Sequence, residues 1–515
     1  MIVGDQREVM DFLSTAAAHG SAEPVHRIET HGAVVFLSGE SAVKLKRAVR
    51  FEYMDYSTVD RRRTACEAEV RINRRTAPSI YRRARAIVRR ADGEIAWDGP
   101  GEVLDWAVCM ARFDETRVFD ELARRHGLSA DLVDQLADVV AAFHERAGPT
   151  PAFGGREGIA EVVAENAAEV SRYPDLFDAA KAADLASAAG ANLTAQAARL
   201  EHRRQQGLVR HCHGDLHLHN ICLVDGLPTL FDAIEFSERF ACIDVFYDLA
   251  FLLMDLWHRG LKGEANRVLN RYLWWRNDLD GLAALPLFLS CRAAIRAHVV
   301  AAARASSTLA PSGGDRQADE ARDYLDLAAT CLRGRSPTLI AIGGLSGTGK
   351  STVANLAAPG LGGIPGALVL QSDVVRKRLF GVAPETRLPA RAYAAPAGER
   401  TYAQLRGQAG SALALGTSVI VDAVHANLQE RQAIEAVAVD AGAPFAGFWL
   451  EAPKQTLRQR VALRGRDVSD ATVDVVERQD RYAIDEISWQ RLDARGDPET
   501  LAERILAFAG VAATS

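Results

Sequence analysis

The segment HCHGDLHLHN, residues 211–220, gathers four histidines, a cysteine, an aspartate and an asparagine. Side chains of these types serve either in a metal cluster or in a loop that handles phosphate. A structural zinc site takes about four nitrogen or sulfur ligands, usually as two pairs. The remaining histidines of the chain are scattered and no Cys-x-x-Cys supplies a second pair. The segment therefore favours phosphate chemistry.

The spacing inside this segment matches H-x-D-x-x-x-x-N, the pattern of a kinase catalytic loop. In that pattern Asp215 accepts the proton of an acceptor hydroxyl, Asn220 binds Mg²⁺, and His213 braces the loop. A hairpin predicted in NICLVDGLPTLFDAIEF then supplies Asp232 as a second magnesium ligand. An aspartate–asparagine–aspartate set suits two phosphate-bound magnesium ions. The aspartates of CIDVFYDLA (242–250) are expected to tie this loop to a helix.

Such a site also needs a lysine on a strand, held by a glutamate on a helix. SAVKLKR (41–47) offers Lys44 or Lys46, and CEAEVRIN (66–73) offers Glu69 or Glu67. The pattern favours Lys44 with Glu69 and leaves the other member of each pair open. The strand WAVCMARF is the expected hinge, whose backbone would meet adenine near Met110.

A second phosphate motif lies far downstream. GLSGTGKS (344–351) fits G-x-x-x-x-G-K-[ST] between a predicted strand and a predicted helix. Its glycines let backbone N–H groups turn toward phosphate oxygens, and the helix presents its positive end. Lys350 can reach the terminal phosphates and the Ser351 hydroxyl can bind Mg²⁺. The expected nucleotide contacts are Gly344, Ser346, Gly347, Thr348, Gly349, Lys350, Ser351 and Thr352.

Residues that follow this motif indicate a kinase. Asp373, after the second predicted strand, can take a proton from an acceptor, and Arg376 can bind a substrate anion. Asp422 ends a further strand, in a Walker-B-like position for Mg²⁺ or its water. In the arginine-rich segment LRQRVALRGRDVSDA, Arg460 and Arg464 are expected to neutralise phosphate charge.

The two groups of candidate site residues, one around Asp215 and one around Lys350, lie in regions whose predicted folds differ. Residues 26–115 are predicted to be mostly strand with a basic helix at about 58–75, and residues 118–305 to be mostly helical. A loop is predicted over 306–315, followed by one more helix.

From residue 338 the strands TLIAIG, ALVLQS, SVIVDA and FAGFWL alternate with helices, which is the pattern of a parallel α/β sheet. We therefore expect a first domain at residues 20–330 and a second at 336–515, with a boundary near residue 335.

The region from about 25 to 305 resembles aminoglycoside phosphotransferases and their relatives, and the motifs HGDLHLHN and LFDAIEF carry this resemblance. The resemblance implies an α+β, protein-kinase-like fold with a small β-rich lobe and a larger helical lobe. No G-x-G-x-x-G precedes Lys44, only FLSGES, and members of this family often lack that pattern. Relatives phosphorylate antibiotics, choline, sugars and amino-sugar derivatives, so the family name does not define the substrate.

The region from about 337 to 511 resembles P-loop kinases of small molecules and polynucleotides. The residues that carry this resemblance are Gly344–Ser351, Asp373-x-x-Arg376 and Asp422. This group includes zeta-toxin-like and gluconate-kinase-like enzymes, and its domains are often labelled AAA family ATPases, although no AAA-specific features are present. The resemblance implies an α/β P-loop NTPase domain in which the aspartate matching Asp373 is the general base.

The overall composition of the chain counts against several classes of protein. The net charge of −6 gives no overall attraction to nucleic acid or to a membrane surface. Residues 44–90 are locally basic, as suits a polyanion site or a solvated helix face. The cysteines form no Cys-x-x-Cys, the N-terminus resembles no signal peptide, and the apolar stretches fall short of a membrane span. We therefore expect a cytoplasmic protein.

Together the motifs predict a bifunctional kinase that uses Mg-ATP to phosphorylate small-molecule acceptors, such as a sugar, an amino sugar or a related hydroxyl compound, at two sites. In one alternative, either half is a regulatory nucleotide-binding module, but complete catalytic sets in both halves count against it. In the other, the second half phosphorylates polynucleotide 5′-hydroxyls, and the overall acidity counts against nucleic acid as a partner.

Overall fold

The computed structural model describes residues 3–51, 54–306, 311–463, 468–479, 484 and 486–510. Packing divides the chain into two compact units. The first consists of Met1–Ile159 and Ala197–Leu252, and the second of Ala160–Gln196 and Leu253–Ser515. This division differs from the boundary expected near residue 335, because the helices after Leu253 pack in the same unit as the C-terminal sheet.

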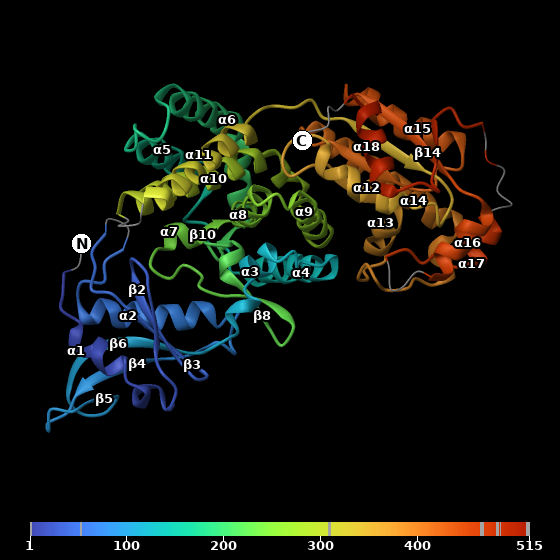
Figure 1. Ribbon diagram of the computed structural model, residues 1–515. Helices are drawn as coiled ribbons and strands as arrows, with labels where there is room; N and C mark the ends of the chain where they lie inside the picture. Colours follow the sequence, from blue (N-terminus) through green and yellow to red (C-terminus); the bar gives the residue numbers. More distant parts are fainter. Residues whose placement is uncertain are drawn as a thin grey trace. The chain divides into compact units, whose positions relative to one another are not determined.

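The first unit opens with a six-stranded antiparallel sheet in the order β1-β2-β3-β6-β4-β5 (Figure 1). Its strands are β1 (His26–Glu29), β2 (Ala33–Ser38), β3 (Ser41–Lys46), β4 (Tyr81–Arg89), β5 (Ile95–Trp97) and β6 (Glu102–Ala111). The short helices α1 (Arg7–Leu13) and η1 (Ala16–His19) precede the sheet. Helix α2 (Val59–Asn73) packs on β4 and β6, and the Thr58 side chain caps it by accepting from the Arg61 N–H.

Apolar layers cover both faces of this sheet. The layer shared with α1 contains Val9, Leu13, Val34, Phe36, Val43, Leu45 and Ile87. The layer shared with α2 contains Cys66, Val70, Tyr81 and Val108. Because successive side chains of a strand point to opposite faces, burial of Val43 and Leu45 toward α1 places Lys44 and Lys46 on the α2 side.

The helical part of the first unit carries the loop that contains Asp215. Its helices are η2 (Glu115–Arg117), α3 (Phe119–Arg124), α4 (Ala130–Arg146), η3 (Leu218–Asn220) and α7 (Glu238–Ala241). Strand β7 (Val209–His211) pairs with β10 (Cys242–Asp244), and β8 (Ile221–Val224) with β9 (Leu227–Leu230), both antiparallel. The β8–β9 turn places Asp225 and Gly226 at φ of 52° and 80°, which is the hairpin expected from the sequence.

Helices α5 (Gly155–Ser171), α6 (Ala179–Gln205) and α8 (Val245–His258) contain the points at which the units divide. The second unit continues with α9 (Lys262–Arg276), η4 (Leu279–Ala283), α10 (Leu285–Ser306) and α11 (Pro311–Cys331). The loop predicted over 306–315 is wrong from Pro311, where α11 begins. The apolar stretches were expected to fall short of a membrane span, but in the described part of the chain one helical stretch, Leu285–Ala305, is long and apolar enough by length and composition alone. Of its most apolar part, 67% is buried inside the protein.

The C-terminal part of the second unit is a parallel sheet in the order β12-β13-β11-β14-β15. Its strands are β11 (Leu339–Gly343), β12 (Leu368–Gln371), β13 (Val419–Asp422), β14 (Phe445–Glu451) and β15 (Gln490–Asp493), the last not predicted. The helices are α12 (Lys350–Ala357), η5 (Ala358–Gly360), α13 (Ser372–Leu379), η6 (Ala390–Tyr393), α14 (Ala395–Ala414), α15 (Leu428–Asp440), α16 (Lys454–Leu463), α17 (Val473–Gln479) and α18 (Pro498–Phe508).

The register of this sheet decides what meets at its carboxyl edge. Asp422 at the end of β13 is level with Ile342 of β11 on one side and with Gln371 of β12 on the other. The loop after β11, Asp422 and the start of α13 therefore share one edge, where ligands bind in open α/β sheets. The central strands and α18 form a fully apolar core that includes Ile340, Ile420, Phe448 and Ile505.

Candidate functional sites

Both candidate lysines of β3 contact the same glutamate of α2. Lys44 Nζ lies 2.9 Å from Glu69 Oε1, and Lys46 Nζ lies 2.6 Å from Glu69 Oε2. Burial alone would raise the pKa of Glu69, but the charges of Lys44 and Lys46 outweigh it and lower that pKa to about 2. Glu67 is on the opposite face of α2, exposed, and pairs with Arg63 at 3.0 Å. The structure therefore brings Glu69 into this site and leaves Glu67 outside it.

The two lysines differ in their second partner. Lys44 Nζ also lies 2.6 Å from Asp232 Oδ1, and its side chain remains 16% exposed. Lys46 is fully buried and pairs with Glu235, which also accepts from the Tyr56 hydroxyl at 2.8 Å. Lys44 thus faces the predicted metal ligand, whereas Lys46 holds the segment that follows it. Sequence reasoning missed Glu235 and Tyr56, although Glu235 lies within LFDAIEF.

Because their second partners differ, replacing Lys44 and replacing Lys46 should have different effects on activity and stability. In Lys44→Met we expect turnover at this site to fall by about 10²-fold, because a partly exposed charge aimed at the phosphate site is lost. In Lys46→Met we expect the free energy of unfolding to fall by about 3–5 kcal/mol, because Glu235 is left buried with its charge uncompensated. Chemical denaturation measures the stability of both variants, and ATP turnover measures their activity. A stable Lys46→Met protein without activity would reverse the assignment.

The loop around Asp215 is held in one conformation by its own residues. Asn220 Nδ2 donates to Asp215 Oδ2 and to the Asp215 carbonyl, both at 2.9 Å. The His213 ring hydrogen-bonds the Phe231 carbonyl at 2.9 Å, and the Phe231 N–H donates to the Asn220 carbonyl at 3.0 Å. Because Asp232 follows Phe231 directly, the β8–β9 hairpin places the backbone before Asp232 against Asn220, while the Asp232 carboxylate itself contacts Lys44.

Asp248 of α8 anchors this loop from behind. Its carboxylate accepts from the backbone N–H groups of His213 at 3.0 Å and of Gly214 at 2.9 Å, and lies 3.1 Å from His144 Nε2. His144, Cys212 and Asp248 are close enough to form the one group among the described residues that could hold a metal ion. The Asp248 oxygens already bind amides, so the group is structural. Asp244 also has a structural partner, Arg203, at 2.8 Å.

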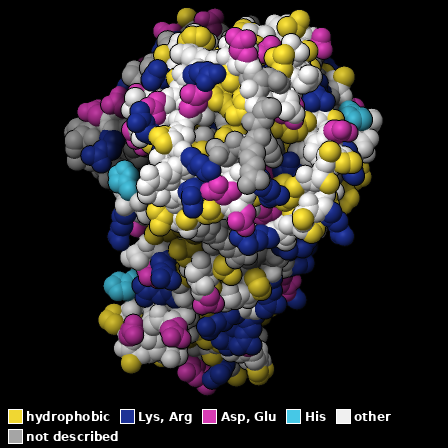
Figure 2. All heavy atoms as spheres, turned by 90° about the vertical axis from the view of Figure 1, so that its right-hand side faces the viewer, with side chains coloured by type: hydrophobic (Ala, Val, Ile, Leu, Met, Phe, Trp, Pro, Cys, Tyr) yellow, Lys and Arg dark blue, Asp and Glu magenta, His cyan; other side chains and the backbone are white. Residues whose placement is uncertain are grey.

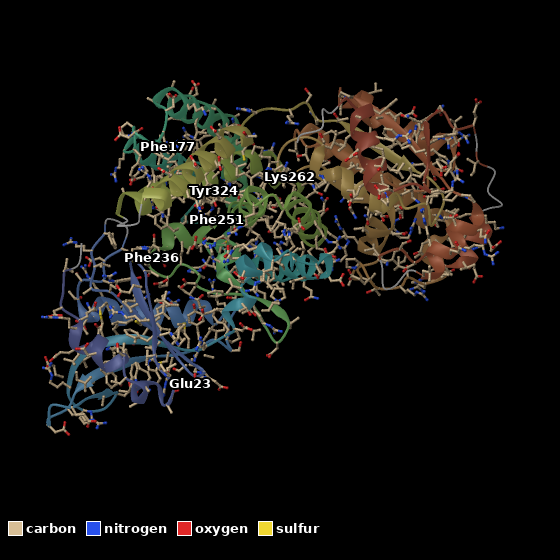
Figure 3. All side chains as sticks on the ribbon, viewed as in Figure 1. Glu23, Phe177, Phe236, Phe251, Lys262 and Tyr324 are labelled. Carbon is tan, nitrogen blue, oxygen red and sulfur yellow. The ribbon has the colours of Figure 1, made fainter. Side chains whose placement is uncertain are left out.

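Two other histidines of the opening segment have distinct partners. His217 Nε2 lies 3.3 Å from Asp215 Oδ2, and its ring lies 5.1 Å from that of Phe251, labelled in Figure 3. His219 Nε2 lies 3.4 Å from Asp120 Oδ1. His217 therefore contacts the carboxylate expected to act as base, and its neighbour His219 points to a different carboxylate.

The expected hinge lies beside an open hollow. Met110 on β6 pairs with Ala42 on β3. From Arg112, two residues after Met110, the chain lines a hollow of about 430 Å³, and the turn between β2 and β3 lines the rest of it. Its lining includes Gly39, Glu40 and Phe113. This volume lies in the range of small-molecule sites, at the end of the strand that the sequence assigned to adenine.

The loop Gly344–Ser351 is a cradle that requires glycine. Gly344, Gly347 and Gly349 have φ of 139°, 88° and 89°. A Cβ on Gly344 would lie 2.6 Å from the Leu450 carbonyl oxygen, and one on Gly347 would lie 2.9 Å from that of Leu457. Since L side chains rarely adopt these dihedrals, the glycines keep the loop backbone tightly curved at the N-terminus of α12.

Around this cradle the predicted residues take the following places. Lys350 Nζ donates to the Leu345 carbonyl at 3.1 Å, and Ser351 Oγ donates to Asp422 Oδ2 at 2.5 Å. Thr348 is buried, with its hydroxyl donating to the Leu345 carbonyl, whereas Thr352 is exposed on the first turn of α12.

Two side chains from other helices border the loop. The Ser346 N–H donates to Gln479 Oε1 of α17 at 2.8 Å. Arg460 donates to the carbonyls of Thr348 and Ala494, so it braces the loop backbone, and Arg464 lies outside the described residues.

Asp373 and Arg376 form a pair on α13. Arg376 Nη1 lies 2.9 Å from Asp373 Oδ1, and its guanidinium lies 4.7 Å from the centre of the Tyr393 ring. Arg376 is mostly buried, and its Nε has no hydrogen-bond partner among the described residues. Tyr393 in turn donates to Asp470 at 2.6 Å, and Asp470 lies 3.2 Å from buried Lys377. Tyr393, Lys377 and Asp470 were not identified from the sequence.

A further residue that sequence reasoning missed is His425, three positions after Asp422. It is almost fully buried, and neither ring nitrogen has a hydrogen-bond partner among the described residues. Burial and the nearby charge of Lys350 lower the pKa of His425 to about 3, so its ring is neutral at physiological pH. Its ring contacts those of Tyr402 and Trp489.

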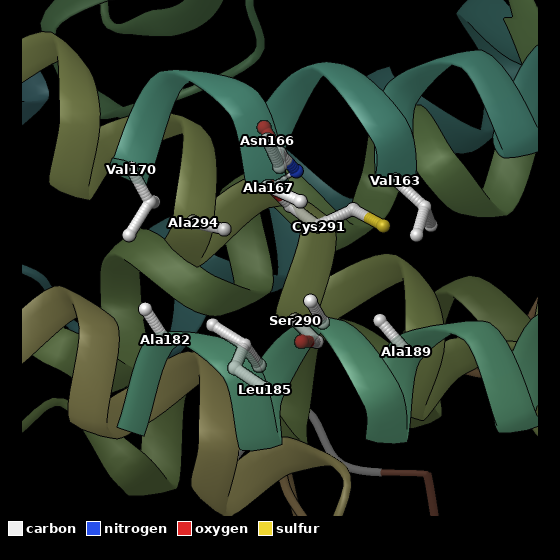
Figure 4. A pocket seen from close by; sticks show the side chains of 11 residues that line it. Val163, Asn166, Ala167, Val170, Ala182, Leu185, Ala189, Ser290, Cys291 and Ala294 are labelled. Atoms are coloured by element: carbon white, nitrogen blue, oxygen red, sulfur yellow. Dashed lines mark hydrogen bonds between the residues drawn. The ribbon is translucent and has the colours of Figure 1, made fainter. Parts of the chain in front are cut away.

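A small, partly open pocket in the second unit is no candidate site. It lies between α5, α6 and α10 and is lined mostly by alanine, valine and leucine (Figure 4). Its volume of about 20 Å³ holds at most a water molecule. The Asn166 side chain on its wall already donates to the Cys291 carbonyl at 3.1 Å and contacts His298.

Two family models match the regions that carry these sites. Residues 41–285 match the model described as Phosphotransferase enzyme family, and residues 339–483 match the model described as AAA domain. The first match contains the Lys44–Glu69 pair and the Asp215 loop, and the second contains the glycine cradle with Asp373 and Asp422. The chain therefore carries a region similar to the phosphotransferase enzyme family, followed by a region similar to a P-loop AAA domain, as the motifs predicted.

Individual proteins are similar over different extents. An uncharacterized protein of Mycobacterium tuberculosis (strain H37Rv) is 27% identical over 480 residues, covering 92% of this chain and 92% of that protein. Among solved structures, amicoumacin kinase in complex with AMP-PNP, Ca²⁺ and Ami covers 63% of this chain and 94% of its own, with 14% identity and a TM-score of 0.37. The APS kinase of Mycobacterium tuberculosis, in complex with AMPPNP and APS, covers 35% and 99%, with 21% identity and a TM-score of 0.26.

Proposed function

We propose that this chain transfers the terminal phosphoryl group of ATP to hydroxyl groups of small molecules at two separate sites. The observation that supports the proposal is that each region contains a lysine, a candidate base and oxygen ligands. The first set is Lys44, Asp215, Asn220 and Asp232. The second is Lys350, Ser351, Asp373 and Asp422.

At the first site, the acceptor oxygen would form a bond to the γ-phosphorus as its proton passes to Asp215. The bond between the γ-phosphorus and the β–γ bridging oxygen would break, leaving ADP. Asn220, which donates to Asp215 Oδ2, keeps that carboxylate oriented. Asn220 and Asp232 offer the hard oxygen ligands that suit Mg²⁺, whose charge would offset that of the phosphates when it is bound.

At the second site, the cradle N–H groups and Lys350 would bind the phosphates of a second ATP. Asp373 is the proposed base for the acceptor, and the bonds made and broken are the same as at the first site. The Arg376 guanidinium, next to Asp373, is the proposed contact for an anionic group of the acceptor. Ser351 and Asp422, already in contact at 2.5 Å, are the proposed magnesium ligands.

Small molecules are favoured over nucleic acid by the surface charge. On the face shown in Figure 2, basic and acidic side chains are interspersed over the described residues, and no broad basic stripe gathers there. In the basic stretch of the sequence, Arg63, Arg85 and Arg89 are paired with carboxylates. Nucleic-acid binding is driven largely by an excess of such positive charge along the phosphate backbone.

The proposal is tested by measuring ATP consumption by the intact chain against a panel of sugars, amino sugars and related hydroxyl compounds. The double variant Asp215→Ala, Lys350→Ala controls for contaminating kinases. We expect at least one acceptor to raise ATP consumption by the intact chain only. If no acceptor does so, the proposal is wrong. If labelled phosphate instead appears on oligonucleotide 5′ ends, the second site has a different substrate class.

A further inference from the structure

Helix α9 turns one polar face to the edge of the P-loop sheet, within the second unit. Lys262, labelled in Figure 3, marks its start. Asn266, Asn270, Trp274 and Asn277 follow at intervals of four, four and three residues, a spacing that places them along one face of a helix. Each contacts a segment that leads to Asp373 or follows it.

The first two of these residues complete the outer edge of strand β12. The Val369 N–H donates to Asn270 Oδ1 at 2.7 Å, and Asn270 Nδ2 donates to the Ala367 carbonyl at 3.2 Å. Asn266, which is buried, donates to the Ala367 carbonyl at 2.9 Å and to that of Pro365 at 3.1 Å. An edge strand needs partners for its outward backbone groups, and these two amides supply them.

Next along the face, α9 holds helix α13 and the segment after it. Trp274 Nε1 donates to the Val374 carbonyl at 3.4 Å, one residue beyond Asp373. Arg271 Nη1 lies 2.6 Å from Glu385 Oε1. These contacts restrain both ends of the segment that carries Asp373 and Arg376.

The end of α9 is capped by arginine and glutamine side chains of the P-loop region. Asn277 has φ of 47°, and its N–H donates to the Leu273 carbonyl at 2.8 Å. Its Oδ1 accepts from Arg378 and, at 2.9 Å, from Gln408. Arg378 also donates to the Leu273 carbonyl at 3.3 Å. A cation at the carbonyl end of a helix is favourable because the helix dipole is negative there.

We propose that α9 is a positioning element of the P-loop site, with Asn277 and Arg378 as its central contact. Arg378 lies two residues after Arg376 on the eight-residue helix α13, so a shift of Arg378 displaces the Asp373–Arg376 pair. Helix α9 belongs to the phosphotransferase-family match at 41–285 and α13 to the match at 339–483. The P-loop site thus depends on a helix from the other family's region. The catalytic consequence rests on the proposed function of the second site.

The test compares Asn277→Gly with Asn277→Asp in the full-length chain. Glycine keeps the left-handed backbone but removes the acceptor for Arg378 and Gln408, whereas aspartate keeps both. In Asn277→Gly we expect amide hydrogen exchange in residues 372–379 to rise by about tenfold, with α12 unchanged. With Asp215→Ala silencing the first site, turnover should fall by about tenfold at an unchanged KM for ATP. Asn277→Asp should behave as the unaltered chain.

Unchanged exchange in residues 372–379 of Asn277→Gly, or equal effects of glycine and aspartate, would overturn the inference. Should Asn277→Gly fail to fold, Trp274→Phe removes the hydrogen bond to Val374 and keeps the packing, and exchange in the same residues decides. Suppose that Asn277→Gly exchanges faster but the unaltered chain transfers no phosphate at the second site. The positioning role of α9 then stands, and only the proposed function is refuted.

Discussion

Replacing Asp215 by asparagine is expected to lower phosphate transfer at the first site by about 10³-fold, because a positioned general base contributes on the order of 10²–10⁴ in rate. ATP binding should persist, since the lysine, Asn220 and Asp232 remain. Asparagine is nearly isosteric and keeps a carbonyl oxygen that can accept from Asn220 Nδ2, so the loop should keep its shape. Acceptor-dependent turnover and nucleotide affinity, measured on the same preparation in a Lys350→Ala background, separate the two effects.

Asp225→Asn is the matched control for that change. Asp225 lies in the β8–β9 turn with φ of 52°, a conformation that asparagine tolerates well. We expect the control to retain full activity. Transfer that survives in Asp215→Asn, or ATP affinity that disappears along with it, would remove Asp215 from the role of base.

Replacing Lys350 by methionine is expected to reduce turnover at the second site by about 10²–10³-fold, because one preorganised charge aimed at the transferring phosphate is lost. The fold should survive, since the apolar core beneath the cradle is untouched and glycine geometry shapes the loop. The measurement is ATP turnover in an Asp215→Asn background.

Lys454→Met serves as the control at this site, since Lys454 is partly exposed and pairs with Glu477 at 2.8 Å on the neighbouring helix. Equal losses in Lys350→Met and Lys454→Met would indicate a general charge effect and contradict the assignment of Lys350 to the phosphates.

Much of the fold could be predicted because its signals are local. The glycine cradle, the Asp225–Gly226 hairpin and four strands of the parallel sheet each depend on a short run of residues. Strand β15 was missed because its four residues, QRLD, are mostly polar and carry no alternation of their own. The loop predicted over 306–315 followed from Ser, Pro and Gly composition, but α11 begins at Pro311, which is favoured at the first position of a helix.

The candidate sites could be predicted only where a motif links residues close in sequence. Asp215 and Asn220 share one loop, and Asp373 and Arg376 share one helical turn. The pattern favoured Lys44 but left Lys46 open, because both point to the same face of β3, and in the structure both bind Glu69. The Lys46 contact to Glu235 spans 189 positions of the chain, and no local pattern records it. The same holds for Asn277 and Arg378, which lie 101 positions apart and meet only in the folded chain.

The most direct test of two independent nucleotide sites is the number of ATP-analogue molecules bound per chain, measured by equilibrium dialysis with a non-hydrolysable analogue and magnesium. We expect two for the intact chain, one for Lys44→Met and one for Lys350→Met. A single bound nucleotide in the intact chain, or the loss of both through either substitution alone, would contradict the assignment of a complete site to each region.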